Sequence, residues 1–175
     1  DTLVCSGGHY PAVFDRRWPR KTVYPGVLAL YRELDLGTEG DELETAWDRL
    51  GNLVFLSARP HVYSDLAERS SYAKFAELVR DRRLHAMPTM LVGDLKAGGE
   101  MMVRGDMEPL ALKKMKNFDE FAALYPEYNF CFIGDNGQGD ARAAELMSPR
   151  LEVAYIHKVQ SLEKPHHRHA TFEEA

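Results

Sequence analysis

The chain has 175 residues, a length that suits one domain able to bury roughly 70% of its unfolded surface. Its 22 Lys and Arg residues against 27 Asp and Glu residues give a net charge of −5, which argues against a nucleic-acid partner held by overall charge. Two cysteines are too few for a disulfide framework, and no stretch has the length of a membrane span or the pattern of a signal peptide. We therefore expect a soluble domain in a reducing, cytoplasmic environment.

The first part of the chain predicts a long loop followed by a helix. Residues 3–24 are rich in glycine, proline, arginine and aromatic residues, with no sustained periodicity. Pro25 suits a first helical position, and Gly37 is expected to end the helix. Residues 37–48 are expected to form a surface excursion. The helix would present one apolar stripe at spacings of three and four residues, made of Val27, Leu30, Tyr31 and Leu34.

Short apolar runs predict strands that alternate with amphipathic helices. The strands are expected at residues 53–56, 90–92, 130–133 and 151–156. Such alternation favours βαβ units with right-handed crossovers, and hence a parallel sheet covered by helices on both faces. Ligands of such sheets bind at the carboxyl ends of the strands. The intervening helices are marked by Phe75, Leu78 and Val79, and by Phe118, Phe121, Ala122 and Tyr125, and the glycine-rich stretch 93–109 is expected to be exposed.

A glycine-rich turn after the third predicted strand holds two carboxylates, Asp135 and Asp140. Magnesium prefers oxygen ligands and takes one or two protein carboxylates beside water and substrate phosphate. The turn could supply these ligands. Equally, the two aspartates could organise the turn and cap the next helix.

Two further signals are compatible with phosphate binding. Ser57 follows the first predicted strand, where its hydroxyl and the N–H groups of a helix start could bind an anion, or where it could act as an N-cap. A cluster of lysines precedes the third strand, and one of them could reach a phosphate, although a solvated helix face has the same composition. The cluster consists of Lys113, Lys114 and Lys116.

The order of these signals resembles motifs two, three and four of the haloacid-dehalogenase superfamily. Asp1-Thr2-Leu3 looks like the end of the superfamily's first motif, Asp-x-Asp-x-Thr, with Thr2 as its threonine. The strings 56–60 and 132–140 look most like the catalytic domain of the actin-patch phosphatidate phosphatase family, relatives of lipins. The resemblance covers residues 1 to about 157, and the Ser-Ala-Arg-Pro string at 57–60 departs from the Ser-Pro-like string expected there.

The resemblance implies a three-layer, Rossmann-like α/β domain over residues 1–158, with a parallel sheet, a flap-like loop at 3–24 and no large cap. The central first strand, with the nucleophilic and acid/base aspartates, would lie before residue 1, so a protein beginning at Asp1 should be poorly stable and inactive. Asp135 and Asp140 would hold Mg²⁺, Ser57 and Arg59 would bind substrate phosphate, and Lys114, or else Lys113 or Lys116, would be the third-motif lysine.

The implied activity is Mg²⁺-dependent hydrolysis of a phosphomonoester through an aspartyl-phosphate, with phosphatidate or a related phospholipid as substrate. The alternatives are a degenerate module that binds anionic lipid, and a phosphatase for a soluble or protein substrate. Basic and aromatic residues of the loop suit an anionic head group at a membrane, although aromatics could instead pin an ordinary loop to the core. These loop residues are Tyr10, Phe14, Arg16, Arg17, Trp18, Arg20 and Lys21.

Other histidines and cysteines are expected to have structural roles or none. His157 is interpreted as a structural histidine, and Cys5 and His9 need no role beyond the loop. Residues 159–175 are expected to form a mobile tail, whose histidines could alternatively bind a transition metal. These tail histidines are His166, His167 and His169.

Overall fold

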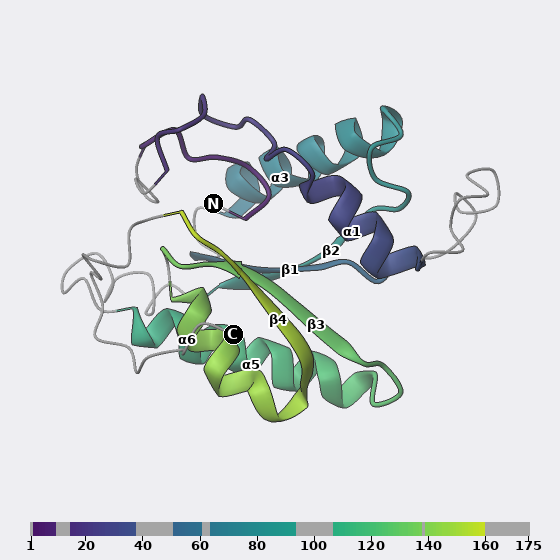
Figure 1. Ribbon diagram of the computed structural model, residues 1–175, viewed down its shortest axis with the longest axis vertical. Helices are drawn as coiled ribbons and strands as arrows, with labels where there is room; N and C mark the ends of the chain where they lie inside the picture. The colour runs from purple at the N-terminus through teal and green to yellow at the C-terminus, as the bar shows by residue number, and fades with distance from the viewer. Residues whose placement is uncertain are drawn as a thin grey trace.

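The computed structural model describes residues 2–9, 15–37, 51–60, 64–93, 107–137 and 139–159. Within these ranges helices and strands alternate, and they lie in three layers, with α1 and α3 on one side of the strands and α5 and α6 on the other (Figure 1). The alternating α/β organisation predicted from the sequence is thus confirmed. In chain order the elements are α1 (Val27–Leu36), β1 (Val54–Pro60), α3 (Ser64–Arg80), β2 (Thr89–Gly93), α5 (Glu108–Leu124), β3 (Phe130–Asp135), α6 (Asp140–Met147), a 3-10 turn (Ser148–Arg150) and β4 (Leu151–His157).

The strands form two parallel pairs. β1 pairs with β2 across the α3 crossover, and β3 pairs with β4 across α6. In the described part of the chain the two pairs are separate two-stranded sheets, linked by α5, which contacts β1, β2 and α6. All four strands end on the same side of the molecule, the left in Figure 1. Polar residues at these carboxyl ends therefore share one edge.

Side chains alternate between two apolar clusters, one on each side of the strands. Phe130 and Phe132 of β3 pack with α5 and α6, whereas Ile133 packs toward α1 and α3. Leu56 and Phe55 of β1 divide in the same way. This is the two-residue period of a strand covered on both faces, and each side chain buried there contributes about 1.5–3 kcal/mol.

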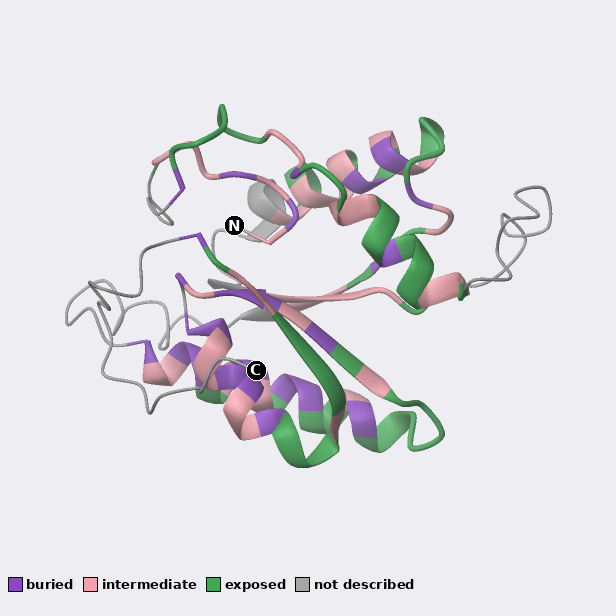
Figure 2. Cartoon of the chain, in the orientation of Figure 1, coloured by how far each residue is buried: buried purple, intermediate pink, exposed green. Residues whose placement is uncertain are grey.

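The apolar stripe predicted for α1 is correct at Val27 and Tyr31 and wrong at Leu30 and Leu34. Leu30 and Leu34 are exposed, whereas Val27, Leu28 and Tyr31 pack into the core (Figure 2). Both stripes satisfy helical spacing, and the contact with Phe55 and its neighbours selects the second one.

The third predicted strand is present, but it is not buried throughout. Cys131 is exposed, as are its neighbours Val153 and Tyr155 on β4. Cys131 pairs with Val153 and Ile133 with Tyr155, so these exposed residues share the face of the β3–β4 pair that points toward α1. Among the described residues, this part of the face has no covering helix (Figure 2).

The predicted loop at 3–24 is folded into a hairpin, a name used below for its described residues 3–9 and 15–24. Val4 and Val23 form an antiparallel bridge, and the Cys5 N–H donates to the Thr22 carbonyl at 2.8 Å. Leu3 is buried in the cluster with α1 and α3. The hairpin is therefore anchored to the domain at its base.

Several expectations fall outside the described residues. They are the surface excursion after Gly37, most of the glycine-rich stretch 93–109, and the tail from residue 160 with His166, His167 and His169. The described end of the stretch 93–109 contradicts the expected exposure, because Met107 is buried and α5 begins at Glu108. Val159, expected in the mobile tail, is also buried, and its N–H donates to Asn136 Oδ1 at 2.8 Å. No helix within the described ranges has both the length and the apolar composition needed to cross a bilayer.

Candidate functional site

The turn between β3 and α6 brings two buried carboxylates together. Asp135 is the last residue of β3 and Asp140 the first of α6, and they are 2% and 5% exposed. The Asp135 N–H donates to Asp140 Oδ2 at 3.2 Å. Gly134 allows this approach, because a Cβ there would lie 2.5 Å from the Asp140 Cβ. The turn is thus built around the two aspartates.

Lys114 joins the same cluster from the middle of α5. It is 7% exposed, and its Nζ forms an ion pair with Asp140 Oδ1. Lys116 instead lies on the solvent side of α5, where it forms a loose pair with Glu120 at 3.7 Å, and Lys113 is half-buried. Of the three predicted alternatives, Lys114 is the lysine that the structure brings to the aspartates.

Thr2, the first described residue, contacts Asp135, which lies 133 residues later in the sequence. Its Oγ1 donates to Asp135 Oδ2 at 3.2 Å, and the Gly137 N–H donates to Asp135 Oδ1 at 2.7 Å. The threonine singled out at the start of the sequence therefore lies at the same carboxyl edge as the turn.

The electrostatics of the two carboxylates differ. Burial opposes ionisation of Asp135, whereas the Gly137 N–H and the Lys114 charge favour it. The pKa of Asp140 is raised, because burial, together with the Asp135 charge, outweighs the Lys114 pairing. Lys114 thus pairs directly with Asp140, whereas Asp135 accepts hydrogen bonds from the Thr2 hydroxyl and the Gly137 N–H.

The residues present fit a magnesium ion only in part. In the described chain, no group of three or more His, Cys, Asp or Glu side chains is placed to hold a metal. Asp135 and Asp140 match the one or two carboxylates that Mg²⁺ takes, the rest of its shell being water and substrate oxygens. Both Asp140 oxygens already accept from Lys114 and the Asp135 N–H, so Asp140 is better placed to orient the site than to bind the ion.

The prediction for Ser57 was wrong about its local structure. The strand does not stop before Ser57 but runs to Pro60, and α3 begins at Ser64, so Ser57 is not at a helix start. The pairing of β1 with β2 shifts between Leu56 and Pro60, which places Ser57 in an irregular part of the strand. Such bulges redirect side chains near sheet ends. The side chain of Arg59 lies outside the described structure.

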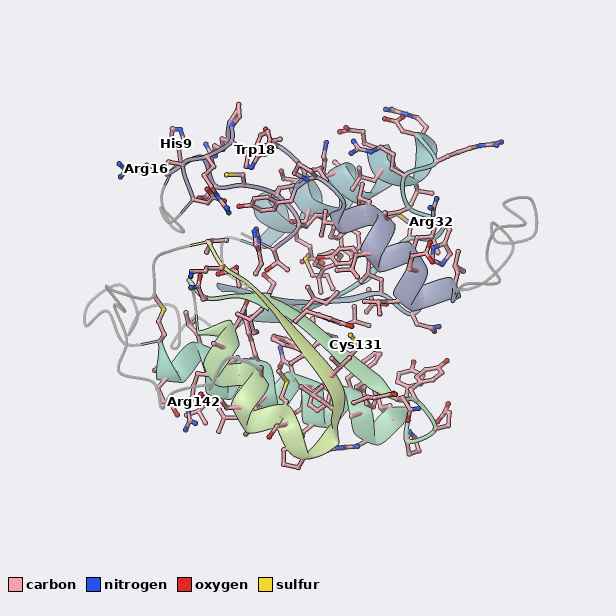
Figure 3. The ribbon with its side chains drawn as sticks, viewed as in Figure 1. His9, Arg16, Trp18, Arg32, Cys131 and Arg142 are labelled. Atoms are coloured by element: carbon pink, nitrogen blue, oxygen red, sulfur yellow. The ribbon has the colours of Figure 1, made fainter. Side chains whose placement is uncertain are left out.

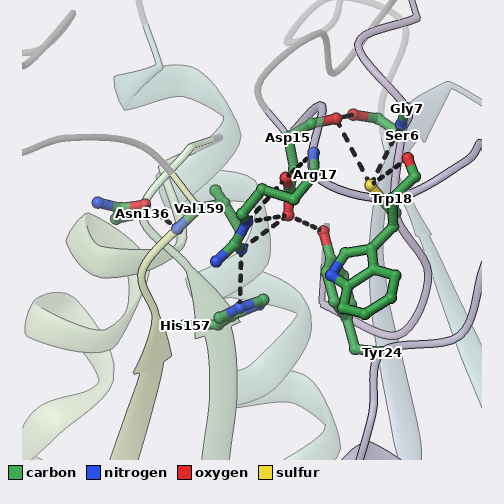
Figure 4. A network of polar contacts seen from close by, with 10 residues as sticks. Ser6, Gly7, Asp15, Arg17, Trp18, Tyr24, Asn136, His157 and Val159 are labelled. Carbon is green, nitrogen blue, oxygen red and sulfur yellow. Dashed lines mark hydrogen bonds and ion pairs between the residues drawn. The ribbon is translucent and has the colours of Figure 1, made fainter.

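A second polar cluster next to the aspartates was missed by the sequence analysis (Figure 4). Asp15, 1% exposed, accepts three hydrogen bonds from the Arg17 side chain and one from the Tyr24 hydroxyl at 2.7 Å. Arg17 Nη2 lies 3.3 Å from His157 Nε2. His157 ends β4 directly beside Asp135. The hairpin is therefore held over the carboxyl ends of β3 and β4.

The contacts in this cluster shift the pKa values of both Asp15 and His157. Hydrogen bonds from Arg17 hold the pKa of Asp15 far below its usual value despite its burial, so Asp15 is ionised. Burial, reinforced by the Arg17 charge, lowers the pKa of His157. One signal could have revealed His157, because it is a polar residue that ends a predicted parallel strand. The same rule had already pointed to Asp135.

Comparison with known proteins found no match among family models, curated proteins or solved structures. The function of this chain has to be inferred from its own residues and contacts.

Proposed function

We propose that this domain hydrolyses phosphate monoesters with the help of Mg²⁺, and that its substrate is phosphatidate or a related phospholipid. The observation that carries the proposal is the contact series Thr2–Asp135–Asp140–Lys114 at the carboxyl ends of parallel strands. The residues come from three separate segments, and their order in the sequence is the order of the superfamily motifs. A turn stabilised only by its own aspartates would need neither Thr2 nor Lys114.

The described residues have distinct roles in this proposal. Asp135, held by hydrogen bonds from Thr2 and the Gly137 N–H, would present a carboxylate oxygen to Mg²⁺, which when bound would neutralise phosphate charge. Lys114 holds Asp140, and Asp140 in turn fixes the backbone of Asp135. Thr2 holds the start of the described chain against Asp135. Lys114 is thus a positioning residue in this structure, and substrate binding would require it to turn from Asp140 toward phosphate.

The nucleophile of the proposed reaction is an aspartate before residue 1. Its carboxylate oxygen would attack phosphorus while the acid/base aspartate, also before residue 1, protonates the ester oxygen, which leaves as an alcohol. Water, giving a proton back to the acid/base aspartate, would then attack the aspartyl-phosphate and release phosphate and the free nucleophile. A strand carrying that aspartate and leading to Thr2 would enter at the edge where Asp135 lies. We propose that it runs between β1 and β3 and joins the two parallel pairs into one sheet of the haloacid-dehalogenase type.

The substrate class is supported by the hairpin. It stands over the ends of β3 and β4 and carries exposed cations, an arrangement suited to an anionic head group. Ser57 remains a proposed phosphate ligand from β1. Arg59 remains proposed on sequence grounds alone.

The test begins with the residues that precede Asp1, which should include the pair Asp-x-Asp. The protein that contains them should release phosphate from short-chain phosphatidate in the presence of Mg²⁺, and a panel of soluble phosphomonoesters and phosphopeptides separates lipid from other substrates. If the upstream pair is not aspartate and no phosphate is released, the phosphatase proposal is wrong.

A further inference from the structure

The outer segment of the hairpin carries concentrated positive charge on a negatively charged chain. Residues 16–21 are all exposed, and the hairpin sequence contains four basic residues and one acidic residue, Asp15. Asp15 is already paired with Arg17. The remaining cations, Arg16, Arg20 and Lys21, form no ion pair with any residue that the structure describes. Three charges are therefore free to meet an anionic partner.

The backbone of the hairpin is ordered by contacts in its interior. Cys5, 1% exposed, has its Sγ within 3.5 Å of the Asp15 and Trp18 carbonyl oxygens, and the Gly7 N–H donates to it at 3.3 Å. Gly8 lets the Arg16 stem pack on the backbone, since a Cβ there would lie 2.7 Å from the Arg16 Cγ. A partner would not have to order this segment, which lowers the cost of binding.

A large aromatic side chain stands among the cations. Trp18 is 42% exposed, and Figure 3 shows it with Arg16 along the outer edge of the hairpin, away from the strands. Indole rings favour the head-group level of a bilayer, where one end is apolar and the other hydrated. An acidic protein would be attracted by the same charges, but an exposed tryptophan among basic residues favours a lipid surface.

We infer that the segment 16–21 docks on the surface of an anionic phospholipid membrane. Arg16, Arg20 and Lys21 would contact lipid phosphates, and Trp18 would enter the head-group layer. Arg17 pairs with Asp15 and lies beside His157, so it takes no part in this contact. This inference goes beyond the proposed phosphatase activity and does not depend on it.

The experiment measures binding of the protein to phosphatidylcholine vesicles with and without phosphatidylserine, by flotation and without added Mg²⁺. Phosphatidylserine is a phosphodiester, so a phosphomonoesterase cannot consume it. Each basic side chain near an anionic surface strengthens binding on the order of fivefold. The triple variant Arg16→Gln/Arg20→Gln/Lys21→Gln should therefore bind roughly a hundredfold more weakly than the wild type.

A matched control removes equal charge elsewhere, at exposed positions of α3, the turn after it and α5. These substitutions are Arg69→Gln, Arg83→Gln and Lys116→Gln, and the resulting protein should bind as the wild type does. A Trp47→Phe background leaves Trp18 as the only tryptophan, whose emission should shift to the blue with phosphatidylserine vesicles. Urea unfolding confirms that each variant is folded.

Three results would overturn the inference. The wild type could bind both kinds of vesicle equally, the triple variant and its control could lose binding equally, or the wild type could bind soluble polyglutamate but not vesicles. The last result would assign the segment to an acidic protein partner. Failure of the phosphatase assay would leave the vesicle result unchanged, so the two proposals fail separately.

Discussion

Lys114 offers the sharpest test of how the buried cluster is held together. Lys114 is 7% exposed and Asp140 is 5% exposed, so their ion pair is largely shielded from water. The substitution Lys114→Met keeps much of the side-chain volume but leaves the Asp140 charge without its ammonium. Removing one partner of a buried pair costs about 3–5 kcal/mol, because the remaining charge is neither solvated nor neutralised. For a domain of this size that loss lowers Tm by roughly 6–20 °C.

Urea unfolding of Lys114→Met, of Asp140→Leu and of the double variant measures this cost. Lys114→Met/Asp140→Leu should be more stable than Lys114→Met alone, because the double variant has no buried charge left over. Lys116→Met is the matched control on the same helix. Its pair with Glu120, at 3.7 Å and exposed on both sides, should contribute roughly 0.5 kcal/mol or less. The reasoning would be refuted if Lys114→Met and Lys116→Met lowered the free energy of unfolding by the same small amount. It would also be refuted if the two single losses simply added up in the double variant.

Two further predictions concern the turn and the hairpin. Gly134→Ala should cost about 1–3 kcal/mol in unfolding free energy, because its Cβ would overlap Asp140; an unchanged urea midpoint would contradict the close packing. Arg17 lowers the pKa of Asp15, so the stability advantage of the wild type over Asp15→Asn should be complete above pH ~4, the unfolded pKa, and should shrink below it. Urea titrations at several pH values measure this advantage, and a constant difference would contradict the assignment.

Features set by local sequence were predicted well. The turn after β3 depends on two glycines and two aspartates that are close in sequence, and its two carboxylates do meet in the structure. Lys114 could even have been chosen from the pattern alone. The buried face of α5 repeats every three or four residues, and Lys114 lies in the middle of it, whereas Lys113 and Lys116 lie off it. The buried residues of this face are Leu110, Ala111, Lys114, Asn117, Phe118 and Ala122.

Features set by distant contacts were predicted poorly. The end of β1 depends on an irregular pairing with β2, so the apolar run at 53–56 could not show that the strand continues through Ser57. The contact between Arg17 and His157 joins segments 140 residues apart through polar groups. Hydrophobic periodicity carries no record of such contacts, and residues 3–24 were therefore interpreted as a loop.

The central claim is that Asp135 serves a magnesium-dependent phosphatase site and is not merely a turn residue. The most direct measurement is phosphate release from short-chain phosphatidate, with and without Mg²⁺, by wild type and Asp135→Asn in a protein that includes the residues preceding Asp1. The account predicts Mg²⁺-dependent release by the wild type and none by the variant, while urea unfolding shows that both are folded. Equal release by the two proteins, or release that does not depend on Mg²⁺, would contradict it.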